Sequence, residues 1–356
     1  HRLNRRQRQM CIRDRFSVTD AELQWQGGTA LGDIDGDGLQ EIVAPTGSHL
    51  VAFEHTGELK WTSPGIADYM VGSADHPAIA DLDGDGAVEV IVGAAIVNGS
   101  DGSLRAVGEH ASSQGGLSGS TAFAADLDGD GQQEVITGSA AFSIDGETLW
   151  HNGLEDGYVA AADFDGDGRG EVVVASEGWV RLQDGDGEVI WDEVLEAEGT
   201  SGPPCVADFD GDGEPEIGVS GTSRFTLLDT DGDVLWERDI DDTNSGITGS
   251  TAFDFDGDGA AEVVVADHGT LWVFRGSDGA VELEYTDHGS GTWMEHPVIA
   301  DVDLDGQAEI LVSHNGGAFA GLSVIGDAGN WWGEAATIWN QYAFSITNIN
   351  SKYKSK

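Results

Sequence analysis

Short runs of apolar, mostly β-branched residues recur along the chain and alternate with stretches rich in glycine and aspartate. Seven such runs stand at residues 42–43, 90–92, 135–136, 172–174, 217, 263–265 and 310–312. Smaller apolar runs precede several of them, at residues 78–80, 159–162, 206–207 and 298–300. Runs this short, bounded by turn residues, are typical of strands buried on both faces. The pattern therefore predicts an all-β chain.

An acidic nine-residue phrase separates the two kinds of strand and occurs seven times. The first copy runs from Asp33 to Glu41, and the others begin at Asp81, Asp126, Asp163, Asp208, Asp254 and Asp301, 37 to 48 residues apart. A period of this length indicates one supersecondary unit per repeat. Acids at positions 1, 3 and 5, glycine at position 6 and a closing acid form the ligand pattern of a calcium loop. Because strands flank it in place of helices, each loop is predicted to join two antiparallel strands and is not an EF-hand.

Each repeat continues into a hairpin that often ends in tryptophan. In the first repeat, residues 50–53 and 58–61 flank a turn, and Asp-Gly turns precede Trp150, Trp191 and Trp236 in later repeats. Asp-Gly between apolar runs is a strong hairpin signal. Seven units of four strands, here called A to D, match a seven-bladed β-propeller with a calcium loop in the A–B hairpin of each blade. A straight β-roll is the competing architecture, but its repeats are nonapeptides.

Two residue types are assigned to packing. A tryptophan at a fixed place near the end of strand D suits the wide outer gap between blades, so we predict packing there in preference to a sugar platform. Cys205 takes the place of Ala78 and Val298 in their repeats, which predicts a small core residue with no disulfide or thiol chemistry.

The chain is strongly acidic, with 65 acidic and 16 basic residues and a formal net charge of −49. A field of this sign repels nucleic acid and anionic membranes. The seven loops contribute four carboxylates each in one register, so cation binding explains much of the excess. No apolar stretch approaches the roughly 20 residues of a membrane helix.

The phrase Asp-x-Asp-x-Asp-Gly-x-x-acid between strands resembles the FG-GAP or VCBS-type repeats of the integrin α-subunit propeller and its bacterial relatives. The resemblance covers residues 21 to about 330. It implies that each loop binds one Ca²⁺, up to seven in all, through the side chains at positions 1, 3, 5 and 9 and the backbone carbonyl at position 7. The implied ligands are Asp33, Asp35, Asp37, Leu39 and Glu41; Asp81, Asp83, Asp85, Ala87 and Glu89; Asp126, Asp128, Asp130, Gln132 and Glu134; Asp163, Asp165, Asp167, Arg169 and Glu171; Asp208, Asp210, Asp212, Glu214 and Glu216; Asp254, Asp256, Asp258, Ala260 and Glu262; and Asp301, Asp303, Asp305, Gln307 and Glu309. Leu304 replaces a glycine that supplies positive φ, which makes the last site the weakest candidate.

The ends of the chain differ in composition from the rest. Residues 1–15 are basic and resemble the translated read-through of a sequencing adapter, so we expect a foreign, disordered leader. Residues 16–338 are assigned to the propeller. Residues 339–356 are expected to be a tail that begins a further, truncated segment. Residues 21–25 copy the strand-D phrase of residues 57–61 and are expected to close the ring, or to be the remnant of an eighth blade.

The leading functional hypothesis is a calcium-stabilised binding or adhesion module of a bacterial surface or secreted protein. It takes a protein or glycan ligand, and it is expected to be a monomeric domain of a larger chain. The alternatives are a calcium-dependent polysaccharide lyase, because similar bacterial propellers cleave pectin-type glycans, and a passive spacer. The sequence contains no Gly-x-Ser-x-Gly, His-Glu-x-x-His, paired-cysteine or phosphate-loop motif, so it indicates no particular reaction. Calcium sites of this kind predict a location outside the cell.

The ligand is expected on the face opposite the calcium loops. Because strands alternate in direction, the calcium loops and C–D turns share one face, and the long, varied B–C and D–A connections form the other. The candidate residues on this ligand face are Tyr69, His76, Trp293, Glu295, His296 and His314. His76 and His296 each precede a proline, Pro77 and Pro297. A simpler interpretation stays open for these two pairs: they start strand A, where proline costs no ladder hydrogen bond.

Overall fold

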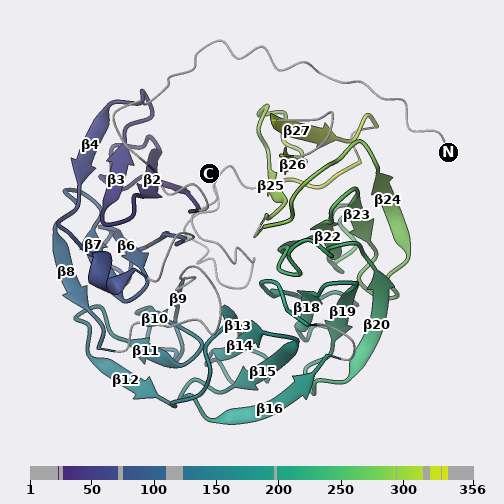
Figure 1. The fold of residues 1–356 in the computed structure, drawn as a ribbon, viewed down its shortest axis with the longest axis horizontal. Coiled ribbons are helices and arrows are strands. Elements are labelled where there is room, and N and C mark those ends of the chain that lie inside the picture. Colours follow the sequence, from purple (N-terminus) through teal and green to yellow (C-terminus); the bar gives the residue numbers. More distant parts are fainter. Residues whose placement is uncertain are drawn as a thin grey trace.

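The computed structural model describes Leu23 and residues 27–70, 75–109, 123–195, 199–293, 295–315, 321–329 and 331–335. Seven antiparallel sheets stand around a central axis (Figure 1). Six sheets have four strands, and the seventh has three among the described residues. The predicted seven-bladed propeller is confirmed.

Each blade takes consecutive strands of the chain, which run in order from the axis outward (Figure 1). Blades 1 and 2 contain β1 (Ala30–Gly32), β2 (Glu41–Pro45), β3 (Leu50–Phe53), β4 (Leu59–Thr62), β5 (Ala78–Ala80), β6 (Glu89–Val92), β7 (Ala95–Asn98) and β8 (Leu104–Val107). Blades 3 and 4 contain β9 (Phe123–Ala125), β10 (Glu134–Ile136), β11 (Ala140–Phe142), β12 (Thr148–His151), β13 (Tyr158–Ala162), β14 (Glu171–Ser176), β15 (Trp179–Gln183) and β16 (Val189–Val194). Blades 5 to 7 contain β17 (Cys205–Ala207), β18 (Glu216–Ser220), β19 (Arg224–Leu228), β20 (Val234–Asp239), β21 (Ser250–Phe253), β22 (Glu262–Ala266), β23 (Leu271–Phe274), β24 (Val281–Tyr285), β25 (Val298–Ala300), β26 (Glu309–His314) and β27 (Gly321–Gly326). A short 3₁₀ helix, η1 (Ala67–Tyr69), lies between blades 1 and 2.

The hydrophobic core lies between neighbouring blades. Val43 and Leu50 of blade 1 pack in one buried cluster with Val90 and Val97 of blade 2. Equivalent clusters join the next blades around the ring. The second strand of each blade is covered on both sides, which explains its unbroken apolar sequence.

The outer tryptophans link neighbouring blades, as predicted. Each indole Nε1 donates a hydrogen bond to a backbone carbonyl in the C–D turn of the next blade. The pairs are Trp61 to Gly99 at 2.7 Å, Trp150 to Gly185 at 2.8 Å, Trp191 to Thr230 at 2.8 Å and Trp236 to Gly276 at 2.5 Å. Gly102, in the turn that receives Trp61, has φ 69° and lies so close to the indole that any Cβ would collide with it.

Cys205 is buried in β17 among apolar side chains, and its sulfur accepts a hydrogen bond from Ser250 at 3.2 Å, so its predicted place in the core is confirmed. Cys11, the leader at residues 1–15, the tail at 339–356 and the ring-closing segment at 21–25, apart from Leu23, lie outside the described residues. Within the described ranges, no helix is long and apolar enough to cross a membrane.

Candidate metal centres and the opposite face

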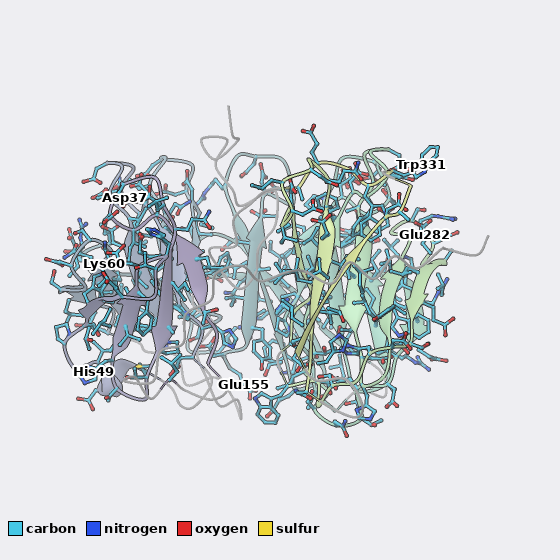
Figure 2. The ribbon with its side chains drawn as sticks, turned by 90° about the horizontal axis from the view of Figure 1, so that it is seen from above. Asp37, His49, Lys60, Glu155, Glu282 and Trp331 are labelled. Carbon is cyan, nitrogen blue, oxygen red and sulfur yellow. The ribbon has the colours of Figure 1, made fainter. Side chains whose placement is uncertain are left out.

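The seven acidic loops connect the first and second strands of their blades, as predicted. Figure 2 shows Asp37 of the first loop at one face of the ring, with His49 of a B–C connection and Glu155 of a D–A connection at the other. The acidic loop and the B–C and D–A connections thus lie on opposite faces, as predicted, while ligand binding on the second face stays a prediction.

The same backbone hydrogen bonds hold all seven loops. The position 1 carboxylate accepts from the N–H of position 6 at 2.9 to 3.1 Å. The position 5 carboxylate accepts from the N–H of position 7 at 2.7 to 3.0 Å. The closing glutamate at position 9 accepts from the N–H of position 2 at 2.6 to 3.2 Å. The backbone of the loop thus orients the carboxylates at positions 1, 5 and 9.

Their oxygens converge closely enough for one cation. In the first loop, one oxygen each from Asp33, Asp35 and Asp37 lie within 4.8 Å of one another, and the same three positions converge in loop 2. In loops 3 and 4 the converging acids are those at positions 1, 3 and 9. Among the described residues, Glu41 Oε1 and Asp81 Oδ1 are buried without a hydrogen-bond partner. Buried oxygens of this kind are costly unless something binds them. The donor set fits Ca²⁺, which prefers several carboxylate oxygens.

Burial makes the closing glutamates hard to ionise without a cation. Burial, together with the charge of nearby carboxylates, raises the pKa of Glu134, Glu216 and Glu262 to about 7. In the other four loops burial raises the pKa of the closing glutamate as well. A bound divalent cation reverses this effect, because it favours the charged form.

Position 4 of the loops requires a left-handed backbone, as the glycine pattern predicted. The six glycines there have φ between 71° and 82°, and Leu304 of the seventh loop has φ 59°. Its side chain is 78% exposed, so the leucine is accommodated with backbone strain and little packing. The carbonyl ligands proposed at position 7 remain a prediction.

On the opposite face, the two predicted histidines occupy equivalent places in blades 2 and 7. His76 and His296 each precede a proline and an innermost strand, and each ring packs tightly on a glycine of the preceding blade, Gly28 or Gly249. The backbone carbonyl of the residue before each histidine accepts a hydrogen bond from the N–H of that glycine. The distances are 3.0 Å for Asp75 O and 2.9 Å for Glu295 O. Burial lowers the pKa of His76 to about 4 and that of His296 to about 3. Both rings are therefore neutral imidazoles that pack against the preceding blade, and their predicted contact with a ligand stays a prediction.

Glu295 lies at the centre of a polar network that the sequence did not reveal. Its carboxylate accepts from Asn315 Nδ2 at 2.6 Å and from the Ser290 hydroxyl. Burial and the nearby Asp242 raise the pKa of Glu295 to about 7. Asp242, itself fully buried, accepts from the Thr248 N–H at 2.8 Å. The Ser245 hydroxyl, which also donates to Asp242, donates to the Thr292 carbonyl and so joins the connections before β21 and β25.

The remaining ligand-face candidates are differently placed. Trp293 is 41% exposed and follows Thr292, which is buried with φ 54°. His314 is buried, with Nδ1 3.2 Å from His288 Nδ1 and Nε2 2.7 Å from the Ser323 hydroxyl, so it braces blade 7. The side chain of Tyr69 lies outside the described residues.

The FG-GAP-like repeat family matches three stretches of the sequence, residues 33–92, 163–219 and 254–312. The chain carries FG-GAP-like repeats. The matched stretches contain six of the seven loops of this FG-GAP-like propeller, all but the loop that begins at Asp126. No curated protein sequence matches the chain.

Solved structures share the FG-GAP-like propeller's fold at low sequence identity. The Vibrio cholerae biofilm matrix protein Bap1 is 19% identical, with a TM-score of 0.77 over 92% of this chain and 81% of that chain. Saccharomyces cerevisiae Sqt1 is 14% identical, with a TM-score of 0.52 over 85% of this chain and 83% of that one. The rhamnogalacturonan lyase YesW is 19% identical over 81% of this chain and 70% of that chain, but its TM-score of 0.48 is too low to bear on activity.

Proposed function

We propose that the protein is a calcium-stabilised, extracellular β-propeller that binds a protein or glycan partner on the face opposite its calcium loops. The first part rests on the seven loops, whose carboxylates are held by the same hydrogen bonds, and on the buried oxygens of Glu41 and Asp81 in the first two loops. The location follows from the metal, because free calcium is abundant outside cells and scarce in the cytosol.

The observation that carries the binding function is the backbone at Thr292. A β-branched residue rarely adopts positive φ, and strained residues are concentrated at functional sites. Here the strained Thr292 directly precedes the exposed Trp293, and the half-buried Glu295 follows two residues later in the sequence. An aromatic face next to a fixed polar group is the usual composition of a small binding surface.

The chain offers a matched pair of tryptophans to test this proposal. Binding of the full chain to immobilised pectin-type polysaccharides, bacterial exopolysaccharides and matrix proteins is measured in calcium. We expect Trp293→Ala to lose binding, and Trp331→Ala to retain it, because Trp331 is 80% exposed on the calcium-loop face (Figure 2). Undiminished binding by Trp293→Ala would place the site elsewhere. Release of unsaturated uronide products by the wild type would favour a lyase.

A second variant tests the polar part of the proposed site, and its substitution must not disturb packing. His296 packs against Gly249, so His296→Ala would leave a gap beside the central axis and confound loss of binding with loss of packing. Glu295→Gln keeps the shape of the side chain and its contact with Asn315. We expect it to weaken binding of the partner while the melting temperature in calcium stays within a few degrees of the wild type.

A further inference from the structure

The outermost strand of a blade contains a β-bulge at one fixed position. In each of the six blades with a described fourth strand, one residue is left over when strands C and D are paired. These six bulge residues are Lys60, Arg105, Leu149, Ile190, Leu235 and Glu282. A bulge redirects its side chain relative to the regular strand.

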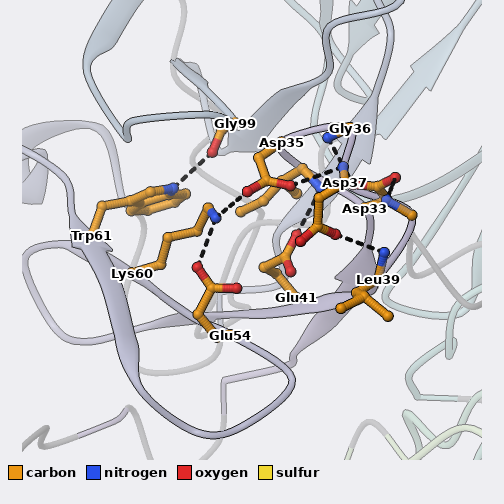
Figure 3. A network of polar contacts seen from close by, with 12 residues as sticks. Asp33, Asp35, Gly36, Asp37, Leu39, Glu41, Glu54, Lys60, Trp61 and Gly99 are labelled. Atoms are coloured by element: carbon orange, nitrogen blue, oxygen red, sulfur yellow. Dashed lines mark hydrogen bonds and ion pairs between the residues drawn. The ribbon is translucent and has the colours of Figure 1, made fainter.

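In blade 1 the bulge residue reaches the blade's own calcium loop. Lys60 Nζ lies 2.5 Å from Asp35 Oδ2 and 2.8 Å from Glu54 Oε1 (Figure 3). Asp35 is the position 3 acid of the first loop, so one of its two oxygens is bound to an ammonium group. The Lys60 side chain is only 12% exposed, so neighbouring atoms cover most of it.

Blade 2 repeats the arrangement with a different cation. The Arg105 guanidinium lies 3.2 Å from Asp83 Oδ2, again the position 3 acid, and 2.8 Å from Oε1 of the closing Glu89. Two unrelated basic side chains thus contact the same oxygen of the equivalent acid from the same bulge position. The chain has only 16 basic residues and 65 acidic ones, so chance pairing at the surface does not explain why both contacts involve the position 3 acid.

None of the other four bulge residues is basic. Leu149, Ile190 and Leu235 are uncharged, and each is at least 43% exposed. Glu282 of blade 6 is an acid, and it is bound to Arg275 at 3.0 Å. Within the described part of blades 1 to 5, only the loops of blades 1 and 2 therefore have a basic side chain bound to the position 3 acid. Arg169, in the loop of blade 4, pairs instead with Asp186 at 3.3 Å.

We propose that the bulge residue sets the calcium affinity of its own blade. Lys60 and Arg105 act as tethered cations that hold the loops of blades 1 and 2 when calcium is scarce and compete with calcium for the same carboxylates. A positive charge about 5 Å from Ca²⁺ raises its dissociation constant about tenfold even at the dielectric constant of water. Blades 3 to 5 consequently fill first and blades 1 and 2 last. This inference rests on the calcium binding proposed above.

Calcium binding to the full chain by equilibrium dialysis tests the proposal directly. We expect Lys60→Met and Arg105→Gln each to convert one weak site of the wild-type isotherm into a site about tenfold stronger. Leu149→Lys should do the reverse in blade 3. Lys60→Arg, which keeps the charge, should leave the isotherm unchanged.

Arg224→Gln is the control for net charge. It removes one positive charge, like Lys60→Met, but Arg224 begins β19 at the opposite face and pairs with Glu237 at 2.8 Å. We expect it to leave all sites at their wild-type affinity. An equal gain in affinity from Arg224→Gln would show that overall charge, and not contact with the loop, sets the affinity, and would overturn the proposal.

The increase in melting temperature on adding calcium distinguishes this proposal from an ion pair that only stabilises the fold. Lys60→Met should lower the melting temperature in EDTA, because the first loop loses its internal cation, and increase the gain on adding calcium. Wild-type and Lys60→Met isotherms that coincide, with calcium bound by both, would overturn this inference alone. A wild-type chain that binds no calcium would overturn the proposed function itself.

Discussion

The indole Nε1 of Trp61 donates a hydrogen bond to the carbonyl oxygen of Gly99, 2.7 Å away across the gap between blades 1 and 2 (Figure 3). The same side chain on strand D makes the same bond in blades 3, 4 and 5. Apolar side chains and further backbone hydrogen bonds also join neighbouring blades, and the tryptophan bond adds a polar contact at the outer strand. The position of the tryptophan in the repeat thus serves the ring and not a ligand.

Replacement of Trp61 by phenylalanine removes that bond and keeps most of the ring. The Gly99 carbonyl is then left buried without its donor, so we expect a loss of about 1 to 3 kcal/mol in the free energy of unfolding. Trp61→Ala also opens a cavity and should cost about 3 to 5 kcal/mol. Urea denaturation in calcium measures both. Trp331→Phe, at an exposed indole, is the control, and a loss there as large as in Trp61→Phe would contradict the assignment.

Calcium removal is expected to lower the stability of the whole ring. With dissociation constants of about 0.1 mM and free calcium of about 1 mM, each site contributes roughly 1.4 kcal/mol through linkage, or about 10 kcal/mol for seven sites. The melting temperature should therefore fall by the order of 20 °C in excess EDTA. Magnesium should restore little of this, since it demands a tighter octahedral shell. An unchanged melting temperature in EDTA would refute structural calcium.

The dependence of stability on pH should change sign with calcium. Burial raises the pKa of Glu134, Glu216 and Glu262 from 4.5 in the unfolded chain to about 7 in the metal-free fold. The fold then binds more protons than the unfolded chain between these values, so metal-free stability increases as pH falls from 7.5 to 6.5. With calcium, protons compete for the ligands, and stability decreases over the same interval.

Below pH 6.5 the histidines act in the opposite direction on the metal-free fold. Burial lowers the pKa of His76 and His288 to about 4 and that of His296 to about 3, so below pH 6.5 the unfolded chain binds protons that the fold does not, and stability decreases as the pH falls.

Glu262→Gln isolates the effect of the closing carboxylate on stability, because glutamine mimics the protonated acid. Its melting temperature in EDTA at pH 7.5 should exceed that of the wild type, and in calcium should lie below it. A decrease in both solutions would contradict the assigned role.

The sequence predicted the repeating parts of the molecule because their signals are local. The acid register from Asp33 to Glu41 and the β-branched run after it lie within about a dozen residues and determine a loop between two strands. The contacts made by bulge residues were not predictable in this way. Whether Lys60 reaches Asp35 depends on the register of strands C and D, and a one-residue difference in pairing redirects the side chain.

Apart from the tryptophans, the contacts between blades were not predictable from the sequence. Gly333 lies between blades 6 and 7, where its N–H donates to Phe255 O at 2.8 Å and its carbonyl accepts from Ala308 N at 2.9 Å. Asn315 meets Glu295 from a different part of blade 7. The polar run at residues 241–245 was the only local signal of this network, and such a run ordinarily indicates just a turn.

Leu304 provides the last prediction, because it adopts φ 59° where the other six loops have glycine. A non-glycine residue in this conformation is strained by about 1 to 2 kcal/mol, whereas glycine costs about 0.4 to 1 kcal/mol through the flexibility of the unfolded chain. Leu304→Gly should therefore be at least as stable as the wild type in calcium, and it loses little packing since the side chain is exposed. Leu39→Gly is the matched control, an exposed leucine of the first loop without positive φ, and it should be destabilising. Thermal melts of the two variants decide the point: equal losses would show that the seventh loop accommodates leucine without strain.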